Sequence, residues 1–253
     1  MKNHTIFFAI LSIALTIILF LPIITLLVTT PLSGYVSVFS DEDALLAIFL
    51  SILSATVTTI LAYTFGIPFA YLIARYNFIG KRLIEEFLDI PIMLPHTVAG
   101  IAILTLLGPR ALIGSSLSAI GILFVDTFWG IVIAQFFVSS PILIKSAIAA
   151  FRSIDEQIIK VARSLGASQF RVFIEIELPL ASRGINTGAV LCWMRAISEF
   201  GAVIILAYYP MTAPVLIFYR FTTSGLRASK PIASVLLLIC LGIFVALKHM
   251  SSE

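Results

Sequence analysis

Two residues of opposite charge stand four positions apart inside a long apolar run, and they are the first candidates for chemistry. Arg195 and Glu199 lie within the run from Gly184 to Tyr209, and helical spacing places residues i and i+4 on one face. Ionised groups in such a run cost about 2.5–3.5 kcal/mol each on membrane-insertion scales, so they pair or face a cavity. Two interpretations stay open: a structural ion pair between helices, or part of a translocation path or its gate.

Two prolines interrupt another apolar run, from Ile90 to Leu107. Proline has no backbone N–H and kinks or breaks a helix, so Pro91 and Pro95 predict a broken span. Such a break either exposes backbone groups to a pore or is a plain kink. We therefore add Pro95 to Arg195 and Glu199 as a candidate residue of the path or gate.

The sequence lacks the motifs of an ATP-hydrolysing, disulfide or metal site. Its only Gly-Lys pair is Gly80-Lys81, and the glycine that a phosphate-binding loop needs five residues earlier is Arg75. Cys192 and Cys240 both lie in apolar stretches, which favours packing over a disulfide or metal site. We expect this chain to carry no catalytic residue, no metal and no cofactor.

The elements that position these residues belong in a membrane. Of the 253 residues, 60% are hydrophobic and 11% are charged, and the mean hydropathy is +1.12. A soluble domain carries about 25% charged residues, so the composition excludes a soluble enzyme and a disordered chain. The net charge of +3 is too small to indicate nucleic-acid binding.

Six apolar runs are long enough to cross the hydrocarbon layer, which takes about 17–25 residues of helix. They are Ile6 to Val28, Ala44 to Ala74, Ile90 to Leu107, Phe128 to Ala150, Gly184 to Tyr209 and Pro231 to Leu247. With both termini inside, 11 of the 16 Lys and Arg residues fall on the cytoplasmic side and four outside. Lys and Arg concentrate on the cytoplasmic side, so the sequence predicts an all-α, six-span membrane protein with both termini cytoplasmic.

This topology divides the chain into three parts. Residues 1–43 form the first span and an external acidic loop, residues 44–247 the core, and residues 248–253 a short cytoplasmic tail. The core contains one long hydrophilic segment, residues 151–183, which is predicted to be cytoplasmic.

Smaller features predict local packing. The small residues Ala62, Gly66 and Ala70, and the pair Gly184 and Gly188, recur every four positions and suit close helix contact. Lys145 and Asp89 lie near span ends, where long side chains reach toward the interface. A further basic group in an outer connector is either solvated or a dock for an acidic protein: Arg220, Arg227 and Lys230.

Segment 151–183 is patterned as two short helices joined at an elbow. Ser153 and Glu156 fit a capping box that starts the first helix. Gly166 stands where a left-handed residue ends it. Ser168 is placed to cap the second helix, and Leu178-Pro179 is predicted to end it.

The same segment resembles the cytoplasmic EAA loop of ABC importer permeases. Ala162, Gly166, the nine residues that follow the glycine, and then Ile176 to Pro179 fit that pattern, whereas Lys160 and Val161 stand where Glu and Ala are usual. Two further stretches, residues 91–100 and 193–202, are similar to signatures of molybdate permeases, and sulfate permeases share much of the pattern.

The resemblance implies the fold of a type I ABC importer permease and a set of residues that contact an ATPase. That set is Val161, Ala162, Ser164, Leu165, Gly166, Ala167, Phe170, Leu178 and Pro179. It also implies a homodimer that binds two ATPase subunits, which use ATP and Mg²⁺, and an extracytoplasmic oxyanion-binding protein. The implied function is import of molybdate or tungstate across the cell membrane; the alternatives are a sulfate or thiosulfate permease and an ion-coupled secondary transporter.

Overall fold

The structure, a computed structural model, describes residues 2–252 and the side chains of residues 4–246. Every regular element in this range is a helix, which confirms the all-α prediction. The elements are α1 (Lys2–Val28), α2 (Leu32–Phe39), α3 (Glu42–Arg75), α4 (Lys81–Phe87), α5 (Ile90–Met93), α6 (His96–Leu107), α7 (Gly114–Ala119), α8 (Phe128–Arg152), α9 (Glu156–Ser164), α10 (Gln169–Val172), η1 (Phe173–Glu177), α11 (Leu178–Ile197), α12 (Gly201–Leu206), α13 (Ala213–Ser224) and α14 (Leu226–Ser252). The side chains of the predicted tail, 248–253, lie outside the described residues.

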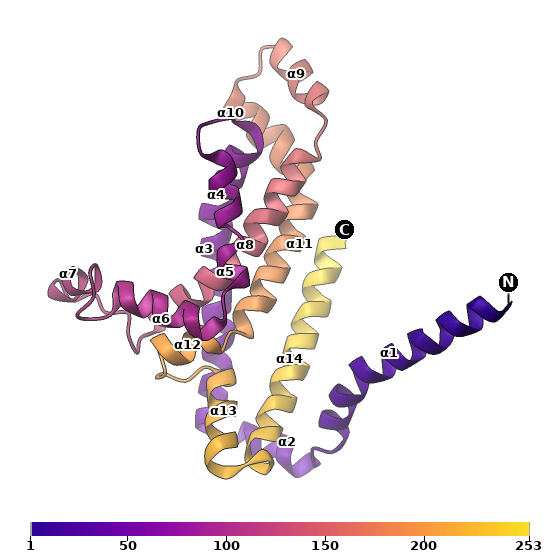
Figure 1. Cartoon of the computed structure of the whole chain (residues 1–253), viewed down its shortest axis with the longest axis vertical. Coiled ribbons are helices and arrows are strands. Elements are labelled where there is room, and N and C mark those ends of the chain that lie inside the picture. The colour runs from indigo at the N-terminus through magenta and orange to yellow at the C-terminus, as the bar shows by residue number, and fades with distance from the viewer. Residues whose placement is uncertain (1, 253) are drawn as a thin grey trace.

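Helices α3, α8 and α11 form the centre of the bundle, and α14 runs beside them (Figure 1). Small residues bring these helices together. A Cβ added at Gly184 would lie 2.6 Å from Ala150 Cβ, and one at Gly188 would lie 2.5 Å from Ser146 Cβ. A Cβ added at Gly66 of α3 would lie 2.9 Å from Ile144 Cγ1 of α8. The predicted small-residue contacts are confirmed, and both join helices within this chain.

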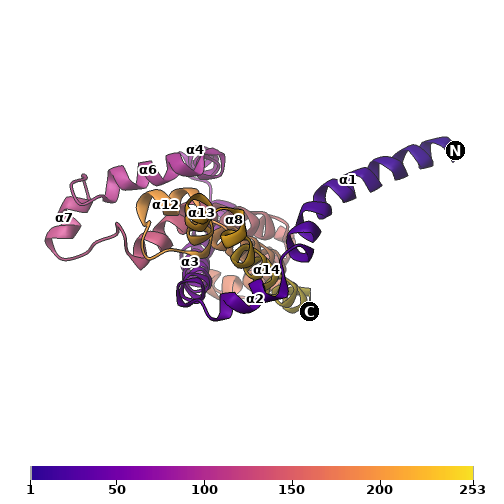
Figure 2. The same cartoon turned by 90° about the horizontal axis from the view of Figure 1, so that it is seen from below.

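Two parts of the chain project from the bundle on opposite sides (Figures 1 and 2). Helix α1 contacts α14 and otherwise projects away from the bundle, with the N-terminus at its far end. Its apolar stretch His4–Val28 is unburied. On the other side, α6 and α7 extend outward, and α12 packs on α6.

Four helical stretches of the described chain are long and apolar enough to cross a membrane: His4–Val28, Glu42–Arg75, Phe128–Arg152 and Leu226–Ala246. A fifth arises if Lys81–Met93 and His96–Leu107 count as one span; the chain bends by 114° between them. The break at Pro95 that the sequence predicts is therefore present. The predicted fifth run is divided between α11 and α12, so the count of six spans stays a prediction.

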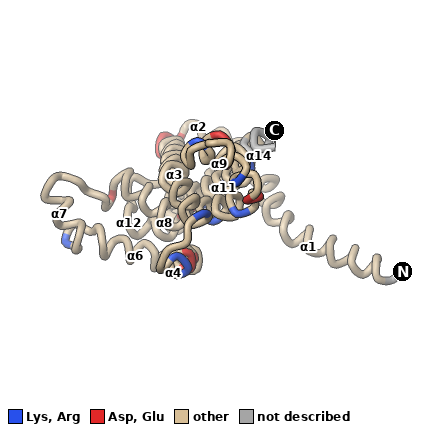
Figure 3. The backbone as a smooth tube through the Cα atoms, turned by 90° about the horizontal axis from the view of Figure 1, so that it is seen from above, with Lys and Arg blue, Asp and Glu red and all other residues tan. Residues whose placement is uncertain are grey.

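Charged residues gather on α4 and on the α9 end of the bundle, while α6 carries none (Figure 3). Lys145 and Asp89, both predicted to reach toward the interface from span ends, pair with each other. Beside it, Arg152 holds Glu85 through two hydrogen bonds of 2.6 and 2.9 Å. These pairs attach α4 and α5 to α8.

An ion pair at the other end of α3 joins it to α13. Asp41 is the N-cap of α3 and accepts a hydrogen bond from the Ala44 N–H at 3.1 Å. Both Nη atoms of Arg220 also donate to this carboxylate. Arg220 is thus paired within the chain, contrary to the expectation of a solvated or docking side chain.

We expect Arg220→Met to lower the thermal stability of the protein at pH 7. Burial acts to raise the pKa of Asp41, but the hydrogen bonds from Arg220 and Ala44 outweigh it and hold the pKa below its ordinary value of 3.8. The stabilisation is therefore complete above pH 3.8 and is lost as pH falls through the folded-state pKa. Thermal unfolding at several pH values should show the difference between wild type and variant disappearing in acid.

The control for this experiment is Asp43→Asn. Asp43 lies 3.9 Å from Arg220 but its side chain is 83% exposed, and exposed pairs contribute little. A stability difference for Arg220→Met that does not change with pH would contradict the assignment to Asp41.

The predicted topology is tested by labelling single cysteines at Ser116, in α7, and at Ser153, which follows α8. Both side chains are exposed, whereas the native Cys192 is buried and Cys240 half-buried. Position 116 should react with a membrane-impermeant thiol reagent from outside, and position 153 only after the membrane is opened. The reverse pattern would overturn the topology.

Candidate functional site

The elbow predicted at residues 162–168 presents apolar side chains to the surroundings. Val161, Leu165 and Phe170 are 60%, 84% and 75% exposed. No side chain of α9 is buried. These three side chains lie in α9, at its C-cap and in α10, and contiguous exposed apolar groups of this kind are typical of interaction surfaces.

The backbone of the elbow forms a Schellman motif. Gly166 has φ +88°, its N–H donates to Arg163 O at 3.0 Å, and the Ala167 N–H donates to Ala162 O at 3.2 Å. Both bonds satisfy carbonyls that a helix end leaves open. Ser168 Oγ then accepts from the Arg171 N–H and caps α10. The predicted left-handed glycine and the second cap are confirmed.

Two details of the predicted loop are wrong. Ser153 ends α8, because its N–H donates to Ala149 O; Asp155, which accepts from the Gln157 N–H, is the N-cap of α9. Leu178-Pro179 does not end the second helix, because α10 continues through the π-helix η1 into α11. Pro179 stands in the first turn of α11, directly after the π-helical turn η1. The loop is thus continuous with a central helix.

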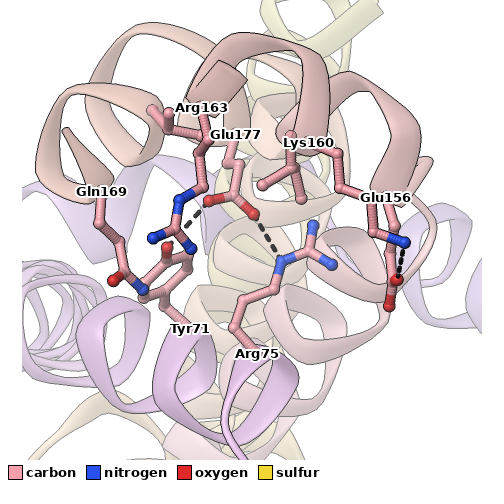
Figure 4. A pocket seen from close by; sticks show the side chains of 9 residues that line it. Tyr71, Arg75, Glu156, Lys160, Arg163, Gln169 and Glu177 are labelled. Atoms are coloured by element: carbon pink, nitrogen blue, oxygen red, sulfur yellow. Dashed lines mark hydrogen bonds and ion pairs between the residues drawn. The ribbon is translucent and has the colours of Figure 1, made fainter. Parts of the chain in front are cut away.

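The base of the loop is attached to α3 by a buried carboxylate that sequence reasoning missed (Figure 4). Glu177, the last residue of η1, is 1% exposed. It accepts hydrogen bonds from Tyr71 Oη at 2.9 Å and from Arg75 Nε at 2.5 Å. A buried carboxylate requires such partners. The partners lie more than 100 residues earlier in the chain, so no local pattern reveals them.

Two of the three predicted path or gate residues, Arg195 and Glu199, pair beside the break between α11 and α12. Pro95 precedes α6, and Glu199 lies between α11 and α12. Arg195 Nη2 is 2.6 Å from Glu199 Oε2 and 2.8 Å from His96 Nδ1. The second oxygen, Glu199 Oε1, accepts from the Ala202 N–H at 2.8 Å and caps α12.

Of the two interpretations left open by the sequence, the structure shows the ion pair, and the path or gate stays a prediction. Glu199 is 1% exposed and Arg195 is 24% exposed, so the pair is mostly buried. The pair itself lies along one chain segment, but His96 links it to α6. Gly201 allows the close approach, since a Cβ there would lie 2.5 Å from His96 Cβ. The cluster therefore ties the two broken segments together.

Comparisons with known proteins show matches that include the loop and the broken helices described above. Residues 66–250 match the family described as binding-protein-dependent transport system inner membrane component. The molybdate/tungstate transport system permease protein WtpB of Pyrococcus abyssi is 40% identical over 98% of this chain and 96% of its own length. Its counterpart from Methanocaldococcus jannaschii is 40% identical over 98% of this chain and 97% of its own length.

More distant similarities extend this set. A probable sulfate transport system permease protein of Chlorokybus atmophyticus is 32% identical over 92% of this chain and 84% of its own length. Among solved structures, a bacterial ABC transporter that imports the polysaccharide alginate superposes with a TM-score of 0.79, at 20% identity over 99% of this chain and 96% of that one. The predicted ABC importer permease fold is thereby confirmed. The chain belongs to the family of inner membrane components of binding-protein-dependent transport systems.

Proposed function

We propose that this chain is the membrane-spanning subunit of an ATP-driven importer for molybdate or tungstate, and that it acts as a homodimer. The observation that carries the proposal is the 40% identity to molybdate/tungstate permeases over nearly the whole chain. The sulfate permeases are less similar, at 31–32% identity, and sulfate or thiosulfate remains the alternative cargo. Residues 1–43 add the first span and external loop to the core 44–247.

The partners follow from the two ends of the molecule. Two ATPase subunits, which use ATP and Mg²⁺, bind residues 151–183 of each chain of the dimer. We call this segment the coupling loop. Their contact includes the side chain of Phe170 and six residues of the elbow: Val161, Ala162, Ser164, Leu165, Gly166 and Ala167. An oxyanion-binding protein delivers the anion at the outer face. A related alginate transporter has been solved with its substrate-bound periplasmic protein, which supports this kind of partner.

Transport proceeds by alternating access. ATP binding closes the ATPase dimer and draws the paired loops together. Displacement of α10 reaches α11 directly, because η1 joins them, and it reaches α3 through Glu177. Pro95, Arg195 and Glu199 lie at the path or gate, where the breaks of two helices respond to movement of α11.

Uptake into proteoliposomes tests the proposal. The chain is reconstituted with its ATPase and binding protein, and uptake of radioactive molybdate is measured with and without internal ATP. We expect ATP-dependent uptake that unlabelled tungstate inhibits and an equal concentration of sulfate does not. Equal inhibition by sulfate would favour the sulfate alternative. Uptake without ATP that a protonophore abolishes would favour a secondary transporter.

A further inference from the structure

A cavity of about 220 Å³ lies between the first helix of the coupling loop and the end of α3 (Figure 4). Its charged lining comes from two distant parts of the chain. Lys160 and Arg163 project from α9, and Arg75 projects from α3. Two carboxylates, Glu156 and Glu177, complete the charged lining.

Both carboxylates are already engaged. Glu177 accepts from Tyr71 and from Arg75 Nε, one bond to each oxygen. Glu156 pairs with Lys160 at 3.4 Å. The acceptors around the cavity therefore have partners inside the protein.

Two cationic groups have donors without partners. Arg75 is only 14% exposed, and its Nη2 is buried without a hydrogen bond. Among the described residues no hydrogen bond or ion pair involves the Arg163 guanidinium group, which points into the cavity in Figure 4. A buried donor that lacks a hydrogen bond costs about 1–3 kcal/mol of folding free energy. The cavity thus offers unmatched donors and positive charge, so a matching occupant is an acceptor with negative charge.

We propose that this cavity binds a single tetrahedral inorganic oxyanion, held by the guanidinium groups of Arg75 and Arg163, which both line it. Guanidinium groups donate to oxyanions in a charge-assisted geometry. The volume is far above the roughly 10–15 Å³ that one water needs, so a five-atom anion fits with its waters. On the predicted topology the site opens to the cytosol, away from the proposed path at Arg195.

Binding there joins two elements that are otherwise loosely connected. Helix α9 buries no side chain, and residues of α9 and of α3 line the same cavity. An anion bridging Arg163 and Arg75 attaches α9 to the end of α3. Binding at this site does not depend on which anion the chain transports, because any tetrahedral dianion can accept hydrogen bonds from the same donors.

Isothermal titration of the purified full-length chain bound to its ATPase tests the site, with tungstate and with inorganic phosphate as separate probes. Arg163→Gln removes a charge from an exposed helix and leaves the fold intact. We expect it to weaken binding of both anions about tenfold or more, as loss of a charge-assisted hydrogen bond predicts. The matched control is Arg171→Gln, an exposed arginine of the same loop that pairs with Glu175 outside the cavity. It should bind like wild type.

Three results would overturn the site. Wild type without measurable binding of either anion at millimolar concentration is the first, and equal loss of binding in Arg163→Gln and Arg171→Gln is the second. The third is binding by the chain alone that disappears when the ATPase docks, since an acidic side chain of the ATPase then fills the cavity. Failure of molybdate uptake, by contrast, would refute the proposed function and leave phosphate binding here unchanged.

Discussion

Replacing Gly166 with valine is expected to abolish the coupling of ATP hydrolysis to transport while the protein still inserts and assembles. Gly166 has φ +88°, and a side chain in the left-handed region costs about 1–2 kcal/mol. The space around the added Cβ is open, so the strain comes from the turn and not from a clash within the chain. Valine also adds bulk to the surface that we propose meets the ATPase. Reconstituted ATPase and uptake assays should show hydrolysis that loaded binding protein no longer stimulates.

The matched control is Gly121→Val. Gly121 has φ +83° and equally open surroundings, but it lies in the connector between α7 and α8. The two variants therefore introduce the same strain at different places. Loss of coupling in Gly166→Val alone identifies the elbow as the contact, whereas normal coupled uptake with valine at 166 would reduce the loop to a surface connector.

The second large effect is expected for Glu199→Gln. Glutamine keeps an oxygen for the Ala202 N–H but leaves Arg195 without its carboxylate. Removing one partner of a buried ion pair costs about 3–5 kcal/mol, and the partial exposure of Arg195 places the loss near the lower limit. Thermal unfolding and the yield of assembled transporter should both fall. Adding Arg195→Met should restore part of the loss, because no unpaired charge then remains.

Glu86→Gln is the control for spacing. Arg82 and Glu86 are also four residues apart and paired at 3.0 Å, but both are exposed, so this change should have little effect on stability. If Glu199→Gln and Arg195→Met each assemble normally while uptake fails, the pair acts on the transported anion and not as a structural link.

Local patterns in the sequence predicted local structure well. The left-handed Gly166 and the cap at Ser168 depend on backbone preferences of neighbouring residues, which short motifs record. The break at Pro95 follows from the missing proline N–H. The close contacts of Gly184 and Gly188 follow from their spacing on one helical face.

The features that escaped prediction depend on partners far along the chain. Glu177 reads as one more acid in a hydrophilic loop, and only the fold brings it to α3. Lys145 and Asp89 each resemble a side chain at a span end until α5 packs on α8. The prediction that Ser153 caps α9 was wrong for a different reason. Asp155, two residues later, is also a capping residue type, and it is the N-cap in the structure.

Helix α3 is unbroken from Glu42 to Arg75, which is about 50 Å at 1.5 Å per residue. Its N-terminal end is held by Asp41 to Arg220, and its C-terminal end is held by Arg75 to Glu177. The helix continues through Pro68 and is attached to other elements at both ends, so a movement of one end is transmitted to the other. A tilt of about 5° around its midpoint moves each end by about 2 Å in opposite directions. A small movement at the loop is therefore reproduced, reversed in direction, at the far end of the molecule beside α13.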